Sequence, residues 1–313
     1  MDTMGAAPGT GPNTGPMSVV RRIPRKKTVG DLPTDRTLVM GVLNVTPDSF
    51  SDGGRFLARA GTAVDHESAV HAGLSLHYAG ADIIDVGGES TRPGAQPVDE
   101  QEEQRRILPV LEALFTGGAV VSVDTRHPGT AAAAIERAPG PEHLLINDVS
   151  GLMTAEHMPQ VVAEGGVRVI VTHNRGDAQT MQSRTDYVDV VAEVIGELEQ
   201  IRDRYRQAGV PAERIILDPG IGFAKTAEQN WELLRHLDRV VSLGHPVLLG
   251  VSRKGFLGEL LAGSEGPREP EGRDAATLAL STLAAQAGAW AVRVHDVGPT
   301  LDAMKAVAEI QSR

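Results

Sequence analysis

The sequence predicts an α/β protein folded as a single (β/α)8 TIM barrel, and three observations support this fold class. From residue 37 onward, short apolar runs rich in β-branched residues alternate with longer segments of helical spacing. Eight such units fill the rest of the chain, as in barrels of about 250 residues. The strands lack regular polar alternation, which indicates a parallel sheet covered on both faces. A doubly wound open sheet is the alternative, and it would require an edge strand.

The eight expected strands are short, nearly continuous apolar runs. They cover residues 37–44, 81–88, 119–125, 143–148, 167–173, 214–220, 246–253 and 290–296. Between them, residues 188–210 have helical apolar spacing that ends at Gly209, and residues 277–289 are apolar almost all round. A helix without a polar face must be covered. We therefore expect residues 277–289 to be deeply buried or to lie in a subunit interface.

Residues 1–36 differ in composition from this repeating pattern. The stretch MGAAPGTGPNTGPM is rich in Gly, Pro and Thr, and such a composition does not form a packed core. The following RRIPRKK adds five charges, and no apolar segment comes after it that could be the core of a signal peptide. We expect a disordered tail over residues 1–36 and a single barrel domain over residues 37–313.

The composition argues against several classes of protein. The chain has no cysteine, which excludes a disulfide scaffold and a Cys-ligated metal site and fits a cytoplasmic location. No run of about 18 apolar residues occurs, so no membrane span is expected. The net charge of −11 disfavours a nucleic-acid partner.

The expected strands all end in polar or charged side chains. These are Asn44, Glu89, Asp124, Asn147, His173, Asp218, the group Ser252-Arg253-Lys254, and Arg293 with His295. In a TIM barrel the carboxyl ends of all strands meet at one face, where active sites are built. One such residue alone is more often a cap or an ion-pair partner. Eight strand ends of this kind at one face predict a functional site.

The types of side chain at this face indicate a ligand that joins a flat heterocycle to a phosphate group. Asp124, Asn147 and Asp218 offer acceptors and one amide donor, which suit the edge of a heterocycle with ring N–H and amino groups. Asn44 offers an oxygen of the kind that Mg²⁺ binds alongside water and phosphate. Several cations suit the phosphate group; they are Arg92, Arg253, Lys254, Arg293 and His295.

Motifs for other kinds of site are incomplete. GIGF after Asp218 contains G-x-G but lacks the third glycine that opens a helix, and no phosphate-binding P-loop motif occurs. A zinc hydrolase barrel would need paired histidines near the first strand, where NVTPD has none. His173 and His295 stand on different strands, and a metal site that joins them is a minor alternative.

Seven motifs in order resemble those of the dihydropteroate synthase family, over residues 38 to about 310. They are MGVLNVTPDSFSDGG, DIIDVGGESTRPGA, VSVDT, INDVSG, LDPGIGFAKT, GVSRKGFLG and RVHDV. Each motif alone is modest, but their joint order is highly specific. The resemblance implies a (β/α)8 barrel that is a transferase of folate biosynthesis and a sulfonamide target. It would join 6-hydroxymethyl-7,8-dihydropterin diphosphate to p-aminobenzoate, release diphosphate, use Mg²⁺ and form a cytoplasmic homodimer.

The resemblance also implies roles for individual residues. The pterin pocket would consist of Asp124, Asn147, Asp218 and Lys254. The diphosphate would contact Arg293 and His295, with Asn44 as the Mg²⁺ ligand. Phe223 and Lys254 would flank the p-aminobenzoate site, and Asp124, Asp218, Lys254 and Arg293 would be the catalytic set. Asp48 and Asp52 lie in the family's first mobile loop, and Thr91, Arg92 and Pro93 lie in its second.

Two departures and two alternatives accompany this resemblance. Gly255 stands where many members have a serine near p-aminobenzoate, and Thr172 stands where many have a methionine against the pterin. A methyltetrahydrofolate-binding methyltransferase domain would keep the pterin pocket but has no use for diphosphate ligands such as Arg293. A catalytically silent paralogue would have lost residues of the opening loop, Arg92 or the SRK motif, and none is lost.

Overall fold

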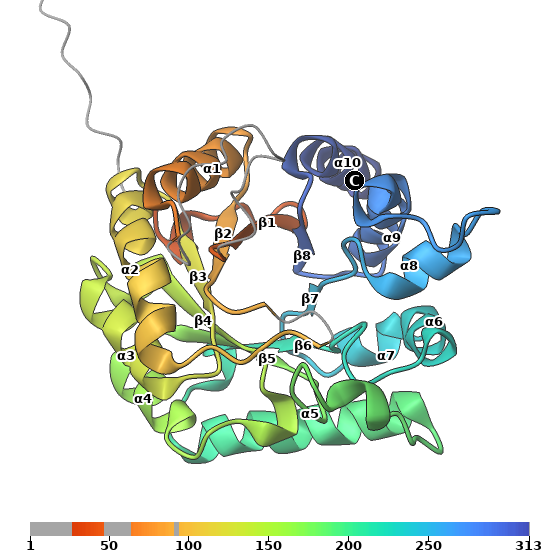
Figure 1. Cartoon of the computed structure of the whole chain (residues 1–313), viewed down its shortest axis with the longest axis horizontal. Coiled ribbons are helices and arrows are strands. Elements are labelled where there is room, and N and C mark those ends of the chain that lie inside the picture. The colour runs from red at the N-terminus through yellow and green to blue at the C-terminus, as the bar shows by residue number, and fades with distance from the viewer. Residues whose placement is uncertain (1–26, 47–63, 91–93, 313) are drawn as a thin grey trace, which may run out of the picture.

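The computed structural model describes residues 27–46, 64–90 and 94–312 of the 313-residue chain. Eight parallel strands lie at its centre and helices surround them (Figure 1). The strands are β1 (Leu38–Asn44), β2 (Ile83–Gly87), β3 (Val121–Asp124), β4 (Leu144–Asp148), β5 (Arg168–Thr172), β6 (Ile215–Asp218), β7 (Leu248–Leu249) and β8 (Ala291–Val294). The prediction of a TIM barrel is confirmed.

The barrel closes between β6 and β7. Ladder hydrogen bonds join all eight strands in the order β6-β5-β4-β3-β2-β1-β8-β7. A bridge between Leu217 and Val247 joins the two ends, and the Leu217 N–H donates to the Pro246 carbonyl at 2.9 Å. This closure contradicts the open-sheet alternative. The strand predicted over 246–253 is shorter because the backbone turns after Leu249, where the Lys254 N–H bonds to the Val251 carbonyl.

Helices follow the strands and cover the outside of the barrel. They are α1 (His66–Tyr78), α2 (Glu100–Thr116), α3 (Pro128–Arg137), α4 (Met158–Gly165), α5 (Val190–Gln207), α6 (Ala227–Arg235), α7 (Leu237–Val241), α8 (Gly255–Leu260), α9 (Asp274–Gln286) and α10 (Val297–Gln311). The predicted helices over 188–210 and 277–289 correspond to α5 and α9. Asp189 caps α5, and Gly209 follows it with a φ of 101°. Within the described ranges, no helix is long and apolar enough to cross a membrane.

Inward-facing side chains form two layers along the barrel axis. The lower layer is apolar; it contains Leu38, Met40, Ile83, Val120, Leu145, Ile170, Ile216, Leu248 and Ala291. Successive side chains of a strand point to opposite faces, so the next inward position comes two residues later. Those next positions carry mainly polar groups, among them Asp85, Asn147, Thr172, Asp218 and Arg293. The strands therefore change from apolar to polar within one step toward their carboxyl ends.

The expected tail over residues 1–36 is wrong for its last ten residues. Residues 27–36 include a 3-10 helix, η1 (Val29–Asp31), and Leu32 is buried with the lower layer of the barrel. Arg36 pairs with Asp82 through two hydrogen bonds of 2.7 and 2.8 Å. This segment packs because Leu32 and the Arg36 guanidinium both find buried partners, although the composition of residues 1–36 as a whole is poor in apolar groups. Residues 1–26 lie outside the described residues.

Candidate active site

A pocket opens at the carboxyl ends of the strands and contains the polar upper layer, with which we group Asp124, the inward residue that follows Ser122 on β3. Asp124, Asn147, Thr172, Asp218 and Arg293 reach it from strands β3, β4, β5, β6 and β8. Loop residues complete the lining; they are Val149, Phe223, Gly250, Ser252, Lys254 and His295. Seven residues predicted from the sequence as substrate-binding thus surround one space: Asp124, Asn147, Asp218, Phe223, Lys254, Arg293 and His295.

Arg293 is held between two buried carboxylates. Its Nε donates to Asp85 Oδ2 at 2.6 Å, and its Nη2 donates to Asp124 Oδ2 at 2.9 Å. Asp85 is fully buried on β2 and is the inward residue two positions after Ile83. These two bonds, to two different carboxylates, fix the plane of the guanidinium.

Burial shifts the pKa values of the ionisable groups in this pocket toward their neutral forms. Burial raises the pKa of Asp124 to about 7; the Arg293 charge opposes the rise and Asp85 adds to it. Burial also raises the pKa of Asp218 and lowers the pKa of Lys254 to about 8. Removal from water disfavours the charged form of each group. The pocket is therefore poised to gain from a ligand that brings complementary charge or hydrogen bonds.

Asn147 lies between an acceptor and a donor that orient its amide. Its Nδ2 donates to Asp85 Oδ2 at 3.3 Å, and its Oδ1 accepts a long hydrogen bond of 3.5 Å from Thr172 Oγ1. The amide therefore presents its oxygen on the side of β5 and its nitrogen on the side of β2. Thr172 takes part in this orientation, a contact that the methionine common in the family could not make.

The loop after β6 brings an aromatic ring and a carboxylate to the same wall. Lys254 Nζ lies 3.9 Å from the centroid of the Phe223 ring, within range of a cation–π interaction. Asp218 Oδ1 accepts from the Gly220 N–H at 2.7 Å, which holds the carboxylate at the end of its strand. Gly220 has a φ of 65°, and a Cβ there would meet the His173 carbonyl, so glycine is required.

The loops after β7 and β8 contribute Ser252 and His295 to the lining. Ser252 Oγ lies 2.8 Å from His295 Nδ1 and also accepts from the His295 N–H at 3.2 Å. Two contacts with one hydroxyl hold the imidazole at the end of β8, two residues beyond Arg293. An imidazole and a guanidinium that leave one strand in the same direction suit a bound anion.

Three other polar strand ends do not reach the pocket. His173 is fully buried and contacts Glu197 on α5 and Lys225, so no metal site joins it to His295. Arg253 pairs with Asp274 of α9 at 2.8 Å instead of facing a phosphate group. Glu89 lies 3.5 Å from Arg126 and 3.7 Å from His127. Each of these side chains serves the packing of loops and helices around the pocket.

The loops predicted to be mobile lie outside the described residues. This applies to Asp48 and Asp52, and to Thr91, Arg92 and Pro93.

Asn44 ends β1 on the same face of the barrel as the pocket. Its side chain is half-buried and has no hydrogen-bond partner among the described residues. In those residues no group of three His, Asp or Glu side chains could hold a metal ion. A cation here would therefore depend on a single amide oxygen together with water and substrate oxygens, and Mg²⁺ commonly keeps several waters and binds substrate phosphates. Asn44 fits such a ligand.

Asp85 is a site residue that the sequence reasoning missed. We considered only the polar ends of the strands, whereas Asp85 lies in the middle of the run ADIIDVGG. A carboxylate inside an otherwise apolar strand was the available signal, because buried charges require partners. Its partners are Arg293 of β8 and Asn147 of β4, strands that lie on opposite sides of β2 in the sheet.

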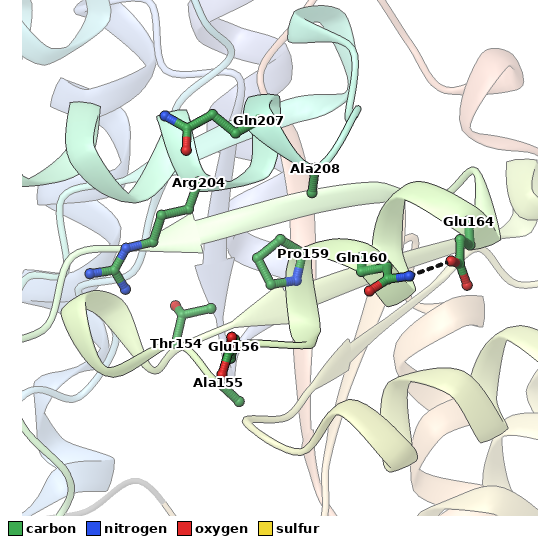
Figure 2. A pocket seen from close by; sticks show the side chains of 9 residues that line it. All are labelled: Thr154, Ala155, Glu156, Pro159, Gln160, Glu164, Arg204, Gln207 and Ala208. Carbon is green, nitrogen blue, oxygen red and sulfur yellow. Dashed lines mark hydrogen bonds between the residues drawn. The ribbon is translucent and has the colours of Figure 1, made fainter.

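A second pocket lies outside the barrel, between α4 and α5, and shares no lining residue with the first. Figure 2 shows its lining, in which Gln160 donates to Glu164 at 2.8 Å. Arg204, Glu156, Gln160 and Gln207 are exposed, and Arg204 bonds to the Leu152 carbonyl. Because these side chains are exposed and bond to other protein groups, nothing indicates a catalytic or binding role for this pocket. The pocket at the strand ends is the candidate active site.

Comparison with known proteins agrees with this assignment. The family model described as pterin binding enzyme matches residues 40–295. Dihydropteroate synthase of Mycobacterium leprae is 47% identical over 271 residues, which cover 86% of this chain and 92% of that protein.

Two solved structures of Xanthomonas albilineans dihydropteroate synthase are also similar. The one with 4-aminobenzoic acid has a TM-score of 0.78 at 42% identity, covering 89% of this chain and 94% of that one. The one with 7,8-dihydropteroate has a TM-score of 0.76 at 40% identity, covering 90% and 96%. The chain therefore belongs to the family of pterin-binding enzymes and, within it, to the dihydropteroate synthases.

Proposed function

We propose that this chain condenses 6-hydroxymethyl-7,8-dihydropterin diphosphate with p-aminobenzoate to give 7,8-dihydropteroate and diphosphate. The observation that supports the proposal most strongly is the pocket at the strand ends, which two carboxylates, one amide and two cations line. A third carboxylate, Asp85, holds Arg293 from behind. The similar X. albilineans enzyme was solved with 4-aminobenzoic acid and with 7,8-dihydropteroate, the second substrate and the product of this reaction.

The carboxylates and the amide recognise the heterocycle. Asp218 and Asp124 accept hydrogen bonds from amino and ring N–H groups, and Asn147 both donates and accepts. Lys254 donates to acceptors of the ring from the wall that carries Phe223. Because burial raises the pKa values of Asp124 and Asp218, hydrogen bonds from the pterin stabilise their ionised forms. Binding thus restores the charge that the empty pocket disfavours.

Arg293 and His295 receive the diphosphate. Arg293 uses Nε and Nη2 on Asp85 and Asp124, so the anion meets the remaining edge of its guanidinium. Asn44 would hold Mg²⁺, which when bound neutralises part of the negative charge on the diphosphate.

The reaction needs no nucleophilic side chain. The bond between the pterin methylene carbon and the diphosphate oxygen breaks, and both electrons leave with diphosphate. The methylene cation is conjugated with the ring, and the ionised carboxylates of Asp124 and Asp218 stabilise it. The p-aminobenzoate nitrogen then bonds to the methylene carbon and loses one proton. Preorganised charge is the largest contribution that such a site makes to a rate.

A coupled assay tests the proposal. The purified chain is mixed with the pterin diphosphate, p-aminobenzoate and Mg²⁺, and diphosphate release is followed together with dihydropteroate formation by chromatography. We expect equal amounts of both products and a requirement for both substrates. No dihydropteroate from the two substrates, or dihydropteroate formed without an equal amount of diphosphate, would contradict the proposed function.

The same proposal includes a homodimer and a cytoplasmic location. On α9 the apolar Leu283 is 57% exposed and Ile310 of α10 is 78% exposed, so these neighbouring helices offer an apolar surface for a second copy. Light scattering of the native chain and of Leu283→Asp tests this, with a dimer expected for the first and a monomer for the second. The cytoplasmic location stays a prediction from the absence of cysteine.

A further inference from the structure

A network of buried and half-buried polar groups supports the β6–α6 loop on the side that faces α5. The loop runs from Pro219 to Thr226 and presents Phe223 to the pocket. Three of its backbone carbonyls accept hydrogen bonds from side chains: Gly220 and Phe223 from Lys225, and Ala224 from Tyr187. We call the five residues Lys225, His173, Tyr187, Arg175 and Glu197 the carbonyl clamp.

Lys225 forms the first arm of the clamp. Its side chain is buried, and Nζ lies 3.0 Å from the carbonyl oxygens of Gly220 and Phe223 and 2.9 Å from His173 Nδ1. An ammonium group only donates, so His173 Nδ1 accepts and the ring proton is on Nε2, which donates to Glu197 at 2.8 Å. All three protons of the ammonium are used inside the protein.

Tyr187 forms the second arm. Its hydroxyl donates to the Ala224 carbonyl at 3.0 Å, and the Arg175 guanidinium covers its ring at 3.7 Å from the centroid. Arg175 pairs with Glu197 at 2.6 Å. Both arms therefore end on Glu197 of α5, and the loop is tied to this helix by charged and hydrogen-bonded contacts.

The loop needs such support because its backbone is strained. Ala224 has a φ of 47°, in the left-handed region that is unfavourable for a residue with a Cβ. Non-glycine residues persist there when the surroundings over-determine the conformation. The clamp bonds the carbonyls of Ala224 itself and of the residue before it. It therefore acts where the strain is stored.

We propose that the carbonyl clamp is a positioning device for the p-aminobenzoate half of the reaction, with Lys225 as its central positioning residue. This inference rests on the proposed function. The clamp residues Lys225, Tyr187 and Glu197 do not line the pocket, so they act through Phe223. The ring of Phe223, under Lys254, forms the wall that an aromatic amine contacts.

The clamp should affect the two substrates unequally. Asp218 is the last residue of β6 and is fixed mainly by its strand pairing with Thr172, which does not involve Lys225. Phe223 has no strand around it and depends on the Lys225 contact and one turn bond to Gly220. Loss of Lys225 should therefore release Phe223 more than it releases the pterin-binding carboxylate.

Steady-state kinetics of Lys225→Met tests the proposal. We expect the KM for p-aminobenzoate to rise about tenfold or more, as for the loss of a hydrogen bond from a charged donor, and the KM for the pterin diphosphate to change much less. Lys305→Met, an exposed lysine of α10, is the matched control and should leave both constants unchanged. An unchanged KM for p-aminobenzoate, or an equal rise in both constants with a lower Tm, would overturn the proposal.

Two further variants keep the test decisive if Lys225→Met folds poorly. Lys225→Ala lacks the atoms from Cγ to Nζ, which together correspond to propylammonium. Propylammonium added to the assay should therefore restore the low KM for p-aminobenzoate, whereas 1-propanol should not. Tyr187→Phe removes only the hydroxyl that bonds to Ala224, and it should raise the same KM by a smaller factor. Tyr187→Phe with native constants, or no rescue by propylammonium, would contradict the clamp. A native chain that makes no dihydropteroate would instead contradict the proposed function.

Discussion

The lower and upper layers of the barrel interior are built from the same strands and differ by one step of two residues. On β6, Ile216 belongs to the apolar lower layer and Asp218 to the polar upper layer. On β8, Ala291 and Arg293 show the same change. The lower layer is sealed by Leu32, whereas the upper layer opens into the pocket. One layer stabilises the barrel, and the other holds groups whose charge burial disfavours.

This difference separates stability from function along each strand. Burying apolar side chains contributes about 1.5–3 kcal/mol each to folding. Burying Asp124, Asp218 and Lys254 costs free energy, as the shift of their pKa values toward the neutral form indicates. These same three groups destabilise the free protein, and a ligand with complementary charge can form ion pairs and hydrogen bonds with them. Substitutions in the two layers should therefore have opposite signatures.

The largest effect is expected for Asp124→Asn in the upper layer. Asparagine keeps the shape but loses the negative charge that stabilises the pterin cation, so turnover should fall by about 100-fold. The asparagine oxygen can still accept from Arg293 Nη2, so the Tm should change little. Measurement of kcat per folded molecule and of the Tm checks both. A well-folded variant with native turnover would exclude this role for Asp124.

Leu32→Ala should have the next largest effect, on stability alone. Leu32 is buried against the lower layer, and removing its methyl groups leaves a cavity that should cost about 2 kcal/mol or more. Urea unfolding measures the loss, and Val188→Ala is the control because Val188 is fully exposed. Activity per folded molecule should not change. Native stability in Leu32→Ala would show that residues 27–36 do not seal the barrel.

The pH dependence of kcat/KM for the pterin diphosphate should follow the upper layer. Below pH 7 Asp124 takes up a proton, because burial raises its pKa to about 7, and the rate should fall about tenfold per pH unit. Above pH 8 Lys254 loses its proton, because burial lowers its pKa to about 8. The profile should be bell-shaped with its maximum between these values. Asp124→Asn should lack the acidic limb, and a profile that keeps it would assign that limb to another group.

Acid should weaken folding through the carbonyl clamp. Burial, followed by the Lys225 charge, lowers the pKa of His173 to about 4, below the value of about 6.5 in unfolded chains. Between these values the unfolded chain binds more protons, so stability should fall as the pH drops from 6.5 to 4. The slope of unfolding free energy against pH measures this, and His173→Gln should flatten it. An unchanged slope in His173→Gln would assign the effect to carboxylates.

Gly255→Ser should have the smallest effect. A Cβ at Gly255 meets no atom within 4 Å, and the residue begins α8, where serine is well tolerated. The unfolding free energy should stay within about 0.5 kcal/mol of the native value. Thermal unfolding checks this. A fall of several degrees would mean that the space beside Lys254 is filled in a way that the described residues do not show.

Much of the barrel was predictable because the eight apolar runs are periodic and end in polar groups. It was harder to predict whether the last residue of a strand points into the barrel or out toward the helices. Thr172 points into the barrel and His173, one residue later, points out to α5, so a shift of one position decides between pocket and packing. The sequence pattern does not say where the sheet ends, and His173 was therefore grouped with residues that it does not meet.

Partners far apart in the sequence explain the other gaps. Asp85 became visible as a site residue only through Arg293, 208 positions away. Lys225 follows the pocket residue Phe223 closely, yet its role depends on His173 and Glu197 from other elements. The order in residues 27–36 likewise arises from partners such as Asp82. Local composition describes what a segment can do alone and not what the rest of the fold offers it.

The most direct test of the two-layer account compares Ile216→Val with Asp218→Asn on the same strand. Asparagine can still accept from the Gly220 N–H, so only the charge is lost. We predict that Ile216→Val lowers the unfolding free energy by about 1 kcal/mol with native kcat, whereas Asp218→Asn keeps or raises stability and loses about 100-fold in kcat. A destabilised Asp218→Asn with native kcat per folded molecule would contradict the account.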